Sequence, residues 1–263
     1  MFSNTDRIYD LEQVRSADAP YMAVHSVGYT YTLHRQHHAR SEDPRSGASG
    51  VVIAGDHNGT HIDALCHQAE SMGMHGDVQV DECVQTSTGF ASMGAETIEP
   101  ILGRGVLLDV AGHRGVPVLQ LDTLVSRADL EAVAAAQGTS IHRGDVVLVR
   151  TGAGAIWDTP TEYIRAAGMA ADASAWLADL RVRVVGSDNI AWDLDSSNID
   201  PTTETSMPGH VILLVRHGIH IIENLYLEEL ANDRVYEFTF ICLPPKLKGA
   251  TGAPVRPVAL VRS

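Results

Sequence analysis

Short apolar segments alternate with helical segments through much of the chain. Residues 105–110 and 145–150 are predicted to be buried strands, because each is an apolar run of strand length. Between them, residues 129–137 have an alanine-rich helical composition, and Gly138 is typical of a helix end. Further predicted elements are helices at 172–180 and 211–216 and extended segments at 182–185, 219–222 and 235–242. This mixture indicates an α/β fold, and the lack of repeats or linker-like composition favours a single domain over residues 1–263.

Three other segments have a distinct composition. Residues 35–50 are polar and rich in turn formers, so we expect a long surface loop. Residues 51–54 are predicted to form a short buried strand that leads into a histidine-rich segment. The tail at 246–257 contains several Gly, Pro and Lys residues, and we expect it to wrap the surface or a neighbouring subunit.

The charge balance excludes some classes of partner. The chain of 263 residues has 33 acidic and 19 basic side chains, a formal net charge of −14. Nucleic acid and anionic membrane surfaces would be repelled, so neither is expected as a partner. The N-terminus lacks a basic region followed by an apolar run, and the three cysteines form no CxxC pair. These features predict a cytoplasmic protein that does not span a membrane.

Residues 57–67 read His-Asn-Gly-Thr-His-Ile-Asp-Ala-Leu-Cys-His and carry the strongest chemical signal. His57, His61 and Asp63 are all odd-numbered, so an extended backbone would project the three side chains from one face. A helix would align the two histidines but turn Asp63 away. Gly59 and the β-branched residues beside it also disfavour a helix. We therefore predict an extended segment with three ligands on one face.

Two imidazoles and one carboxylate form a ligand set that suits Zn²⁺, Mn²⁺ or Fe²⁺ and leaves positions open for a reactive water. The missing side chain of Gly59 is expected to let substrate or another backbone approach the ion. Chance is the competing interpretation, because the chain has 13 histidines. Seven of them lack such a pattern and are expected to be solvated or locally hydrogen-bonded: His34, His37, His38, His113, His142, His217 and His220.

The pattern in residues 57–67 resembles the signature of the cyclase superfamily of metal-dependent hydrolases. This superfamily includes bacterial kynurenine formamidases (arylformamidases), isatin hydrolases and related lactam and lactone hydrolases. Residues 209–214 and 218–225 resemble the family's later segment, in which a His and a Glu complete the metal centre. The resemblance thus extends over at least residues 51–225.

The resemblance implies specific metal ligands. His57, His61 and Asp63 correspond to the ligands of a first ion, and Asp63 is able to bridge to a second. His210 and Glu223 correspond to the remaining ligands of the two-metal forms. The implied cofactor is Mn²⁺ or Zn²⁺, bound as one or two ions.

The resemblance also implies a catalytic residue and an architecture. His67 corresponds to the family's proton-transfer histidine. The implied fold is a swivelling β/β/α fold with a barrel-like mixed sheet flanked by helices. Assembly as a homodimer or higher homo-oligomer is implied as well.

One departure bears on the substrate. The formamidases typically have Pro two residues before the last histidine of the motif, whereas residues 64–66 here are Ala-Leu-Cys. This difference favours the isatin-hydrolase and cyclic-amide branch. The predicted activity is therefore hydrolysis of a small carbonyl substrate, an isatin-like or lactam cyclic amide or a lactone, by attack of a metal-bound hydroxide.

Three alternatives remain open. The first is an arylformamidase acting on N-formylkynurenine. The second makes Cys66 a nucleophile, although its adjacency to His67 argues against a Cys–His pair, since neighbours on an extended backbone point in opposite directions. The third is a non-catalytic homologue that binds metal or ligand without turnover, against which the presence of His67 argues.

Overall fold

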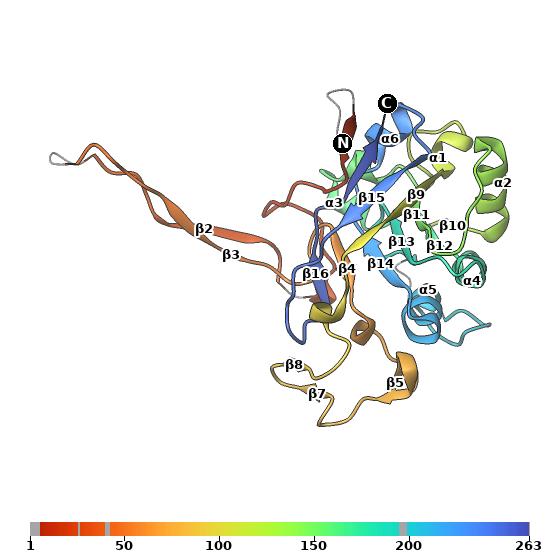
Figure 1. Cartoon of the computed structure of the whole chain (residues 1–263), viewed down its shortest axis with the longest axis horizontal. Helices are drawn as coiled ribbons and strands as arrows, with labels where there is room; N and C mark the ends of the chain where they lie inside the picture. The colour runs from red at the N-terminus through yellow and green to blue at the C-terminus, as the bar shows by residue number, and fades with distance from the viewer. Residues whose placement is uncertain (1–5, 26, 40–42, 195–198, 263) are drawn as a thin grey trace.

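A computed structural model of the chain describes residues 6–25, 27–39, 43–194 and 199–262. Within these ranges one large mixed sheet dominates the body of the molecule (Figure 1). Its nine strands, in spatial order, are β1 (Arg7–Asp10), β17 (Val258–Val261), β15 (Glu237–Cys242), β9 (Ile101–Asp109), β11 (Val146–Arg150), β13 (Val184–Ser187), β14 (His220–Glu223), β4 (His61–Asp63) and β16 (Gly252–Pro254).

Strands β9, β11, β13 and β14 run parallel, and the pairings on either side of them are antiparallel. The sheet curls strongly into a half-barrel with helices beside it. This arrangement confirms the expected α/β class with a barrel-like mixed sheet flanked by helices.

The described residues contain six α-helical segments, most of them short. They are α1 (Val110–His113), α2 (Arg127–Gln137), α3 (Pro160–Tyr163), α4 (Ala171–Asp179), α5 (Pro208–His210) and α6 (Glu228–Asn232). A π-helix, η6 (Val211–Arg216), continues directly from α5. None of the helices in the described ranges has the length and apolar character needed to cross a membrane.

The remaining elements are short turns and two-stranded sheets. The 3-10 turns are η1 (Ala23–His25), η2 (Leu65–His67), η3 (His75–Asp77), η4 (Ala95–Thr97) and η5 (Ala153–Ile156). The two-stranded sheets pair β2 (Thr30–Arg35) with β3 (Ser49–Ile53), β5 (Gly73–Met74) with β6 (Val78–Gln79), β7 (Gln85–Thr86) with β8 (Gly89–Phe90), and β10 (Leu124–Val125) with β12 (Gly168–Met169).

The central strands are buried on both faces, as their continuous apolar sequences predict. In β9, Leu108 belongs to the core under the helices, which includes Leu130 of α2 and Leu177 of α4. Its neighbour Leu107 belongs to the core on the other face, together with Phe240 of β15. Because successive strand residues point to opposite faces, the same strands build both cores.

Helix α2 shows how local sequence signals fix an element. The Ser126 side chain accepts a hydrogen bond from the Asp129 backbone N–H, and the Asp129 carboxylate accepts one from the Ser126 N–H, which forms a capping box. Gly138 ends the helix with a left-handed φ of 67°. The predicted helix at 129–137 and its glycine stop are confirmed.

Most other predicted elements are also present. The apolar strands and the helices at 172–180 and 211–216 occur within a few residues of their expected positions. The structure differs at residues 51–54, where β3 is exposed along its whole length and pairs only with β2. The predicted loop at 35–50 is the distal part of this hairpin, and residues 40–42 of it lie outside the described residues.

Candidate metal centre

Two antiparallel strands bring the carboxylates of Asp63 and Glu223 together. Strands β4 and β14 pair with His61 opposite Glu223 and Ile62 opposite Ile222. His61 and Asp63 are two residues apart on β4, so they project from the same face, as the alternating pattern predicts. All three polar side chains are buried.

His57 reaches the same place from outside the strand. It lies in a turn before β4, and Gly59, with a φ of 66°, reverses the backbone between them. The Nδ1 atom of His57 is 3.0 Å from Oδ1 of Asp63. The prediction of one extended segment from residue 57 to 63 is therefore wrong for His57, although the three ligand types do converge.

Gly59 has a different role from the expected one. A Cβ atom at this position would lie 2.8 Å from Nη1 of Arg15. The Arg15 guanidinium donates hydrogen bonds to the carbonyl oxygens of Asn58 and Thr60. Gly59 thus permits the left-handed turn and the close approach of Arg15, which holds the backbone of the turn.

His210, the last residue of α5, completes the cluster. Its Nε2 atom lies 3.5 Å from Oδ2 of Asp63 and 3.3 Å from Oε1 of Glu223. On the opposite side, Glu223 places Oε2 3.3 Å from Nε2 of His61. The structure therefore brings all five predicted ligands into one buried group.

Each of the three clustered histidines has its other ring nitrogen held by a protein acceptor. Nδ1 of His61 lies 2.8 Å from the Gly59 carbonyl oxygen, and Nδ1 of His210 lies 2.7 Å from Oδ2 of Asp193. Donation of an N–H at these positions leaves Nε2 of both rings as a lone-pair ligand.

His57 is oriented in the same manner by the C-terminal tail. The Thr251 hydroxyl donates to Oδ2 of Asp56, so it accepts from Nε2 of His57 at 2.8 Å. This leaves Nδ1 of His57 facing Asp63. Thr251 directly precedes β16, which pairs with β4. The tail prediction is therefore wrong in part, since this part of the tail is a strand of the main sheet that supports the site.

Several buried polar atoms at the centre of the cluster have no hydrogen-bond partner among the described residues. They are Oδ1 and Oδ2 of Asp63, Oε1 of Glu223 and Nε2 of His61. Burial of two adjacent carboxylates is unfavourable without a cation or donors. These carboxylate and imidazole atoms face only one another, at 3.0–3.5 Å, and their convergence fits a divalent metal ion.

The ligand atoms form two overlapping groups. One atom each from His57, His61 and Asp63 lie within 4.8 Å of one another, and the same holds for Asp63, His67 and His210. Asp63 belongs to both groups. His67 is thus placed where it could itself contact an ion, which the sequence interpretation did not include.

His67 is buried beside the ligands in the η2 turn. Its ring centroid is 4.0 Å from that of His57 and 5.8 Å from that of His210. Burial lowers the pKa of His67 to about 3, and nearby His57 and His210 add to this effect. The imidazole is therefore neutral at pH 7.

The electrostatics of the ligands depend on the two carboxylates. Burial alone would lower the pKa of His61, but the negative charges of Asp63 and Glu223 outweigh it and raise the pKa to about 10. Burial would raise the pKa of Asp63, yet the surrounding histidines hold it well below its usual value. The metal-free site is thus an ion-paired cluster.

Besides Thr251, two contributors to the site were missed by the sequence interpretation. Asp193 accepts a hydrogen bond from Nδ1 of His210. In the sequence, the only indication of a role at the site is that Asp193 lies in the polar segment after the predicted strand at 182–185. His25 stacks on His57 with ring centroids 4.8 Å apart and an interplanar angle of 24°. Nothing in the local sequence around His25 marks it, because it is far from the motif in the chain.

Cys66 does not have the environment of a nucleophile. It is 3% exposed, and its Sγ atom lies 3.6 Å from the Ala250 carbonyl oxygen, as a weak donor. Burial raises the pKa of the Cys66 thiol to about 12. Reactive cysteines instead have lowered pKa values and accessible sulfurs, so the geometry argues against this alternative.

Comparison with known proteins finds a matching family model and several sequence relatives. A family model described as "Putative cyclase" matches residues 9–194, more than two thirds of the chain. A kynurenine formamidase from Bacillus cereus is 29% identical over 219 residues, 82% of either protein. A kynurenine formamidase from Delftia acidovorans is 37% identical over 82 residues, which cover 31% of this chain and 34% of that protein.

Solved structures show the same architecture. The crystal structure of a novel cyclase superposes with a TM-score of 0.85 and 26% identity, over 97% of this chain and 87% of that one. Isatin hydrolase A from Ralstonia solanacearum shares the fold, with a TM-score of 0.75 and 22% identity over 98% of this chain and 92% of that one. The family model matches more than half of the chain, and the structure contains a buried His/Asp cluster that can hold a metal ion. The chain belongs to the cyclase family.

Proposed function

We propose that this cyclase-family chain is a metal-dependent hydrolase that acts on a non-peptide C–N bond or a lactone ester. The observation that carries the proposal is the pair of overlapping ligand groups that share the buried Asp63. His57, His61, His210 and Glu223 are the other proposed ligands of one or two Mn²⁺ or Zn²⁺ ions. Both metals accept mixed imidazole and carboxylate ligand sets.

A divalent ion held by these residues would lower the pKa of a bound water to about 7 and would polarise a carbonyl oxygen. The chain's own residues supply the rest. Asp193 and Thr251 fix the rings of His210 and His57, which keeps the ligand geometry rigid. The neutral imidazole of His67 is proposed to take a proton and deliver it to the leaving nitrogen or oxygen.

The role of His67 can be tested separately from metal binding. If it only transfers protons, His67→Ala retains the wild-type number of bound ions and loses turnover. If it is a ligand, as its position in the second group allows, the variant loses one equivalent of metal as well. Counting metal by elemental analysis beside an activity assay separates the two roles, and unchanged turnover would contradict both.

For the substrate, we propose an isatin-like or lactam cyclic amide, or a related lactone. The Ala-Leu-Cys sequence at residues 64–66 supports this choice over a formamide. N-formylkynurenine is the second candidate, and the kynurenine formamidases among the sequence relatives support it. Comparison of kcat/KM on isatin, small lactams, lactones and N-formylkynurenine decides between them.

A non-catalytic metal-binding homologue is the alternative from another class. It predicts bound metal without hydrolysis of any of these compounds. In our proposal residues 1–263 act as a single cytoplasmic domain on a small-molecule substrate, without nucleic acid or membrane partners. Assembly as a homodimer or higher homo-oligomer is also part of the proposal.

A further inference from the structure

The ring of His25 lies against the metal centre, although His25 belongs to neither ligand group. His25 is the last residue of η1, and its ring stacks on that of the proposed ligand His57, with centroids 4.8 Å apart. The centroid of the His67 ring is 5.9 Å from that of His25. His25 therefore lies beside both a proposed ligand and the proposed proton-transfer residue, and the mechanism so far gives it no role.

Backbone contacts hold η1 next to the segment that leads to His57. The His25 N–H donates to the Met22 carbonyl oxygen at 3.0 Å, which closes the turn. The Gly55 N–H donates to the Val27 carbonyl oxygen at 3.2 Å, and Gly55 lies just before His57 in the chain. The fold of the chain thus places the His25 ring on that of His57.

His25 also differs from the ligands in its exposure to solvent. The five proposed ligands are each at most 7% exposed. His25 and His67, in contrast, are partly exposed. A buried ion can be reached only past residues that meet the solvent, so these two side chains mark a side from which a substrate approaches the metal centre.

The ring nitrogens of His25 are free of protein partners. Neither forms a hydrogen bond with any residue that the structure describes. Each of the three ligand histidines instead has one ring nitrogen held by the protein, and Nε2 of His67 lies 3.3 Å from Nε2 of Gln68. A neutral imidazole has one N–H and one lone pair, so His25 offers a hydrogen-bond donor to a molecule that enters the site.

We propose that His25 binds the substrate by donating this N–H to a second carbonyl oxygen, close to the scissile carbonyl. The inference rests on the proposed function, in which the scissile carbonyl is required at the metal ions. Because His25 lies outside both ligand groups, its N–H is available to a different polar atom of the same substrate. A buried site with a few precisely placed polar groups selects ligands in this way.

This role narrows the class of substrate. Isatin has a ketone next to its amide carbonyl, and N-formylkynurenine has a ketone on the same benzene ring as its formamide. Simple lactams and lactones have only the scissile carbonyl and leave the N–H of His25 without a partner. The site is therefore expected to favour compounds that have a second carbonyl group, since an unpaired polar group in a site penalises the ligand that lacks its partner.

Two product-like probes test the inference separately from hydrolysis. Isatinate, the ring-opened form of isatin, has a carboxylate, an aromatic amine and a ketone. Its counterpart ortho-aminophenylacetate has a methylene group in place of the ketone. We expect the metal-loaded wild type to bind isatinate about 10-fold more tightly in isothermal calorimetry, which is the usual net effect of one hydrogen bond. Neither probe has a bond for the enzyme to hydrolyse, so the comparison does not depend on turnover.

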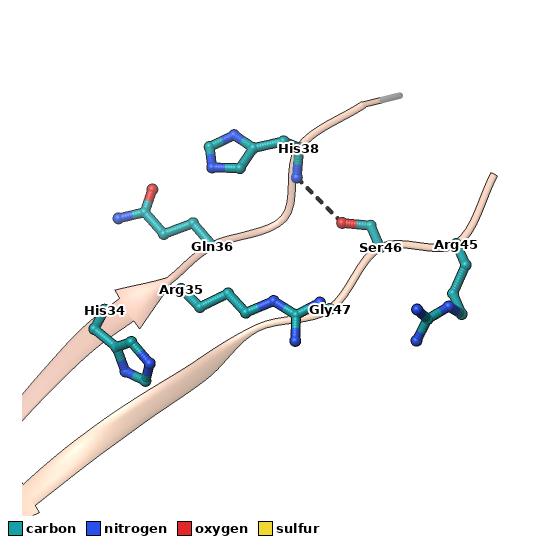
Figure 2. A pocket seen from close by; sticks show the side chains of 7 residues that line it. All are labelled: His34, Arg35, Gln36, His38, Arg45, Ser46 and Gly47. Atoms are coloured by element: carbon teal, nitrogen blue, oxygen red, sulfur yellow. Dashed lines mark hydrogen bonds between the residues drawn. The ribbon is translucent and has the colours of Figure 1, made fainter. Parts of the chain in front are cut away.

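Two substitutions separate hydrogen bonding from stacking. His25→Phe retains an aromatic ring against His57 but has no N–H, so it should keep the wild-type metal content and bind both probes equally. His25→Gln has an amide N–H but no ring, and should keep part of the preference for isatinate. His34→Phe is the matched control, because Figure 2 shows His34 at a pocket that shares no residue with the metal centre. It should retain the full preference.

Elemental analysis of each variant gives the metal content beside the binding data. A His25→Phe protein that keeps the preference for isatinate would overturn the inference, and so would a wild type that binds both probes equally or binds neither. Loss of metal in His25→Phe would also overturn it, since His25 would then act by holding His57. If isatinate binds through His25 but isatin and N-formylkynurenine are not hydrolysed, the proposed hydrolysis fails and the binding role of His25 stands.

Discussion

Oδ2 of Asp193 lies 2.7 Å from Nδ1 of His210, and both side chains are buried. The same carboxylate accepts hydrogen bonds from the backbone N–H groups of Gly209 and His210, at 2.7 and 3.0 Å. Three donors thus fix one carboxylate, which in turn fixes the ring. The orientation of Nε2 toward Asp63 and Glu223 depends on this contact.

Asp193→Asn should weaken metal binding. An amide lacks the negative charge and turns an N–H₂ group toward donors, so His210 loses its fixed tautomer. We expect the affinity for Zn²⁺ or Mn²⁺ to fall about 10- to 100-fold, the usual effect of losing such a partner. Isothermal calorimetry measures this, with Asp122→Asn, an exposed ion-paired carboxylate, as the control. Unchanged affinity in Asp193→Asn would show that the contact does not position His210.

Metal binding should release protons. The carboxylates of Asp63 and Glu223 raise the pKa of His61 to about 10, so the metal-free ring is protonated near neutral pH. A metal ion must displace this proton, and affinity should therefore rise as the pH increases toward that value. The same raised pKa stabilises the metal-free fold fully below about pH 6.5, and this contribution is lost as the pH rises through about 10.

Calorimetry in buffers of different ionisation enthalpy counts the protons released. At least one proton per first ion is expected near pH 7. Metal affinity that does not change with pH in the neutral to alkaline range would contradict this picture of His61.

Cys66→Ala should retain turnover. The thiol is buried and its pKa is raised to about 12, so no thiolate is available for attack. Loss of the sulfur costs packing, and a stability decrease on the order of 1 kcal/mol is expected. Steady-state kinetics on the metal-loaded variant check this. A loss of several orders of magnitude in kcat would restore the nucleophile alternative.

Arg150→Met should destabilise the fold without touching the site. The guanidinium forms ion pairs with Asp109 at 2.7 Å and Glu228 at 2.6 Å, and all three side chains are largely buried. Removal of one partner leaves uncompensated buried charge, which costs about 3–5 kcal/mol. Urea denaturation measures the change. Arg165→Met, at an exposed pair with Asp122, should leave the unfolding free energy almost unchanged, and equal effects of the two would contradict the argument.

The sequence predicted elements whose signals are local. The alanine-rich composition of residues 129–137 and the stop at Gly138 predicted α2, and burial on both faces follows from the continuous apolar runs of β9 and β11. The placement of His61 and Asp63 on one face follows from the two-residue strand period. Each of these conclusions needs only neighbouring residues.

The missed features depend on contacts between distant segments. Asp193 meets His210 through packing of the segment after β13 against α5, and Thr251 meets His57 because β16 pairs with β4. Neither pairing has a signature in the residues themselves. The exposure of β3 was missed for a similar reason, since an apolar strand has the same sequence whether its own chain or another molecule covers it.

The central claim is that His61 holds a catalytic metal ion. The most direct test measures bound metal and hydrolysis of the candidate substrates together for His61→Ala, with the exposed His113→Ala as the control. We predict that His61→Ala loses both metal and turnover while His113→Ala retains both. A folded His61→Ala protein that keeps its metal and its rate would contradict the account.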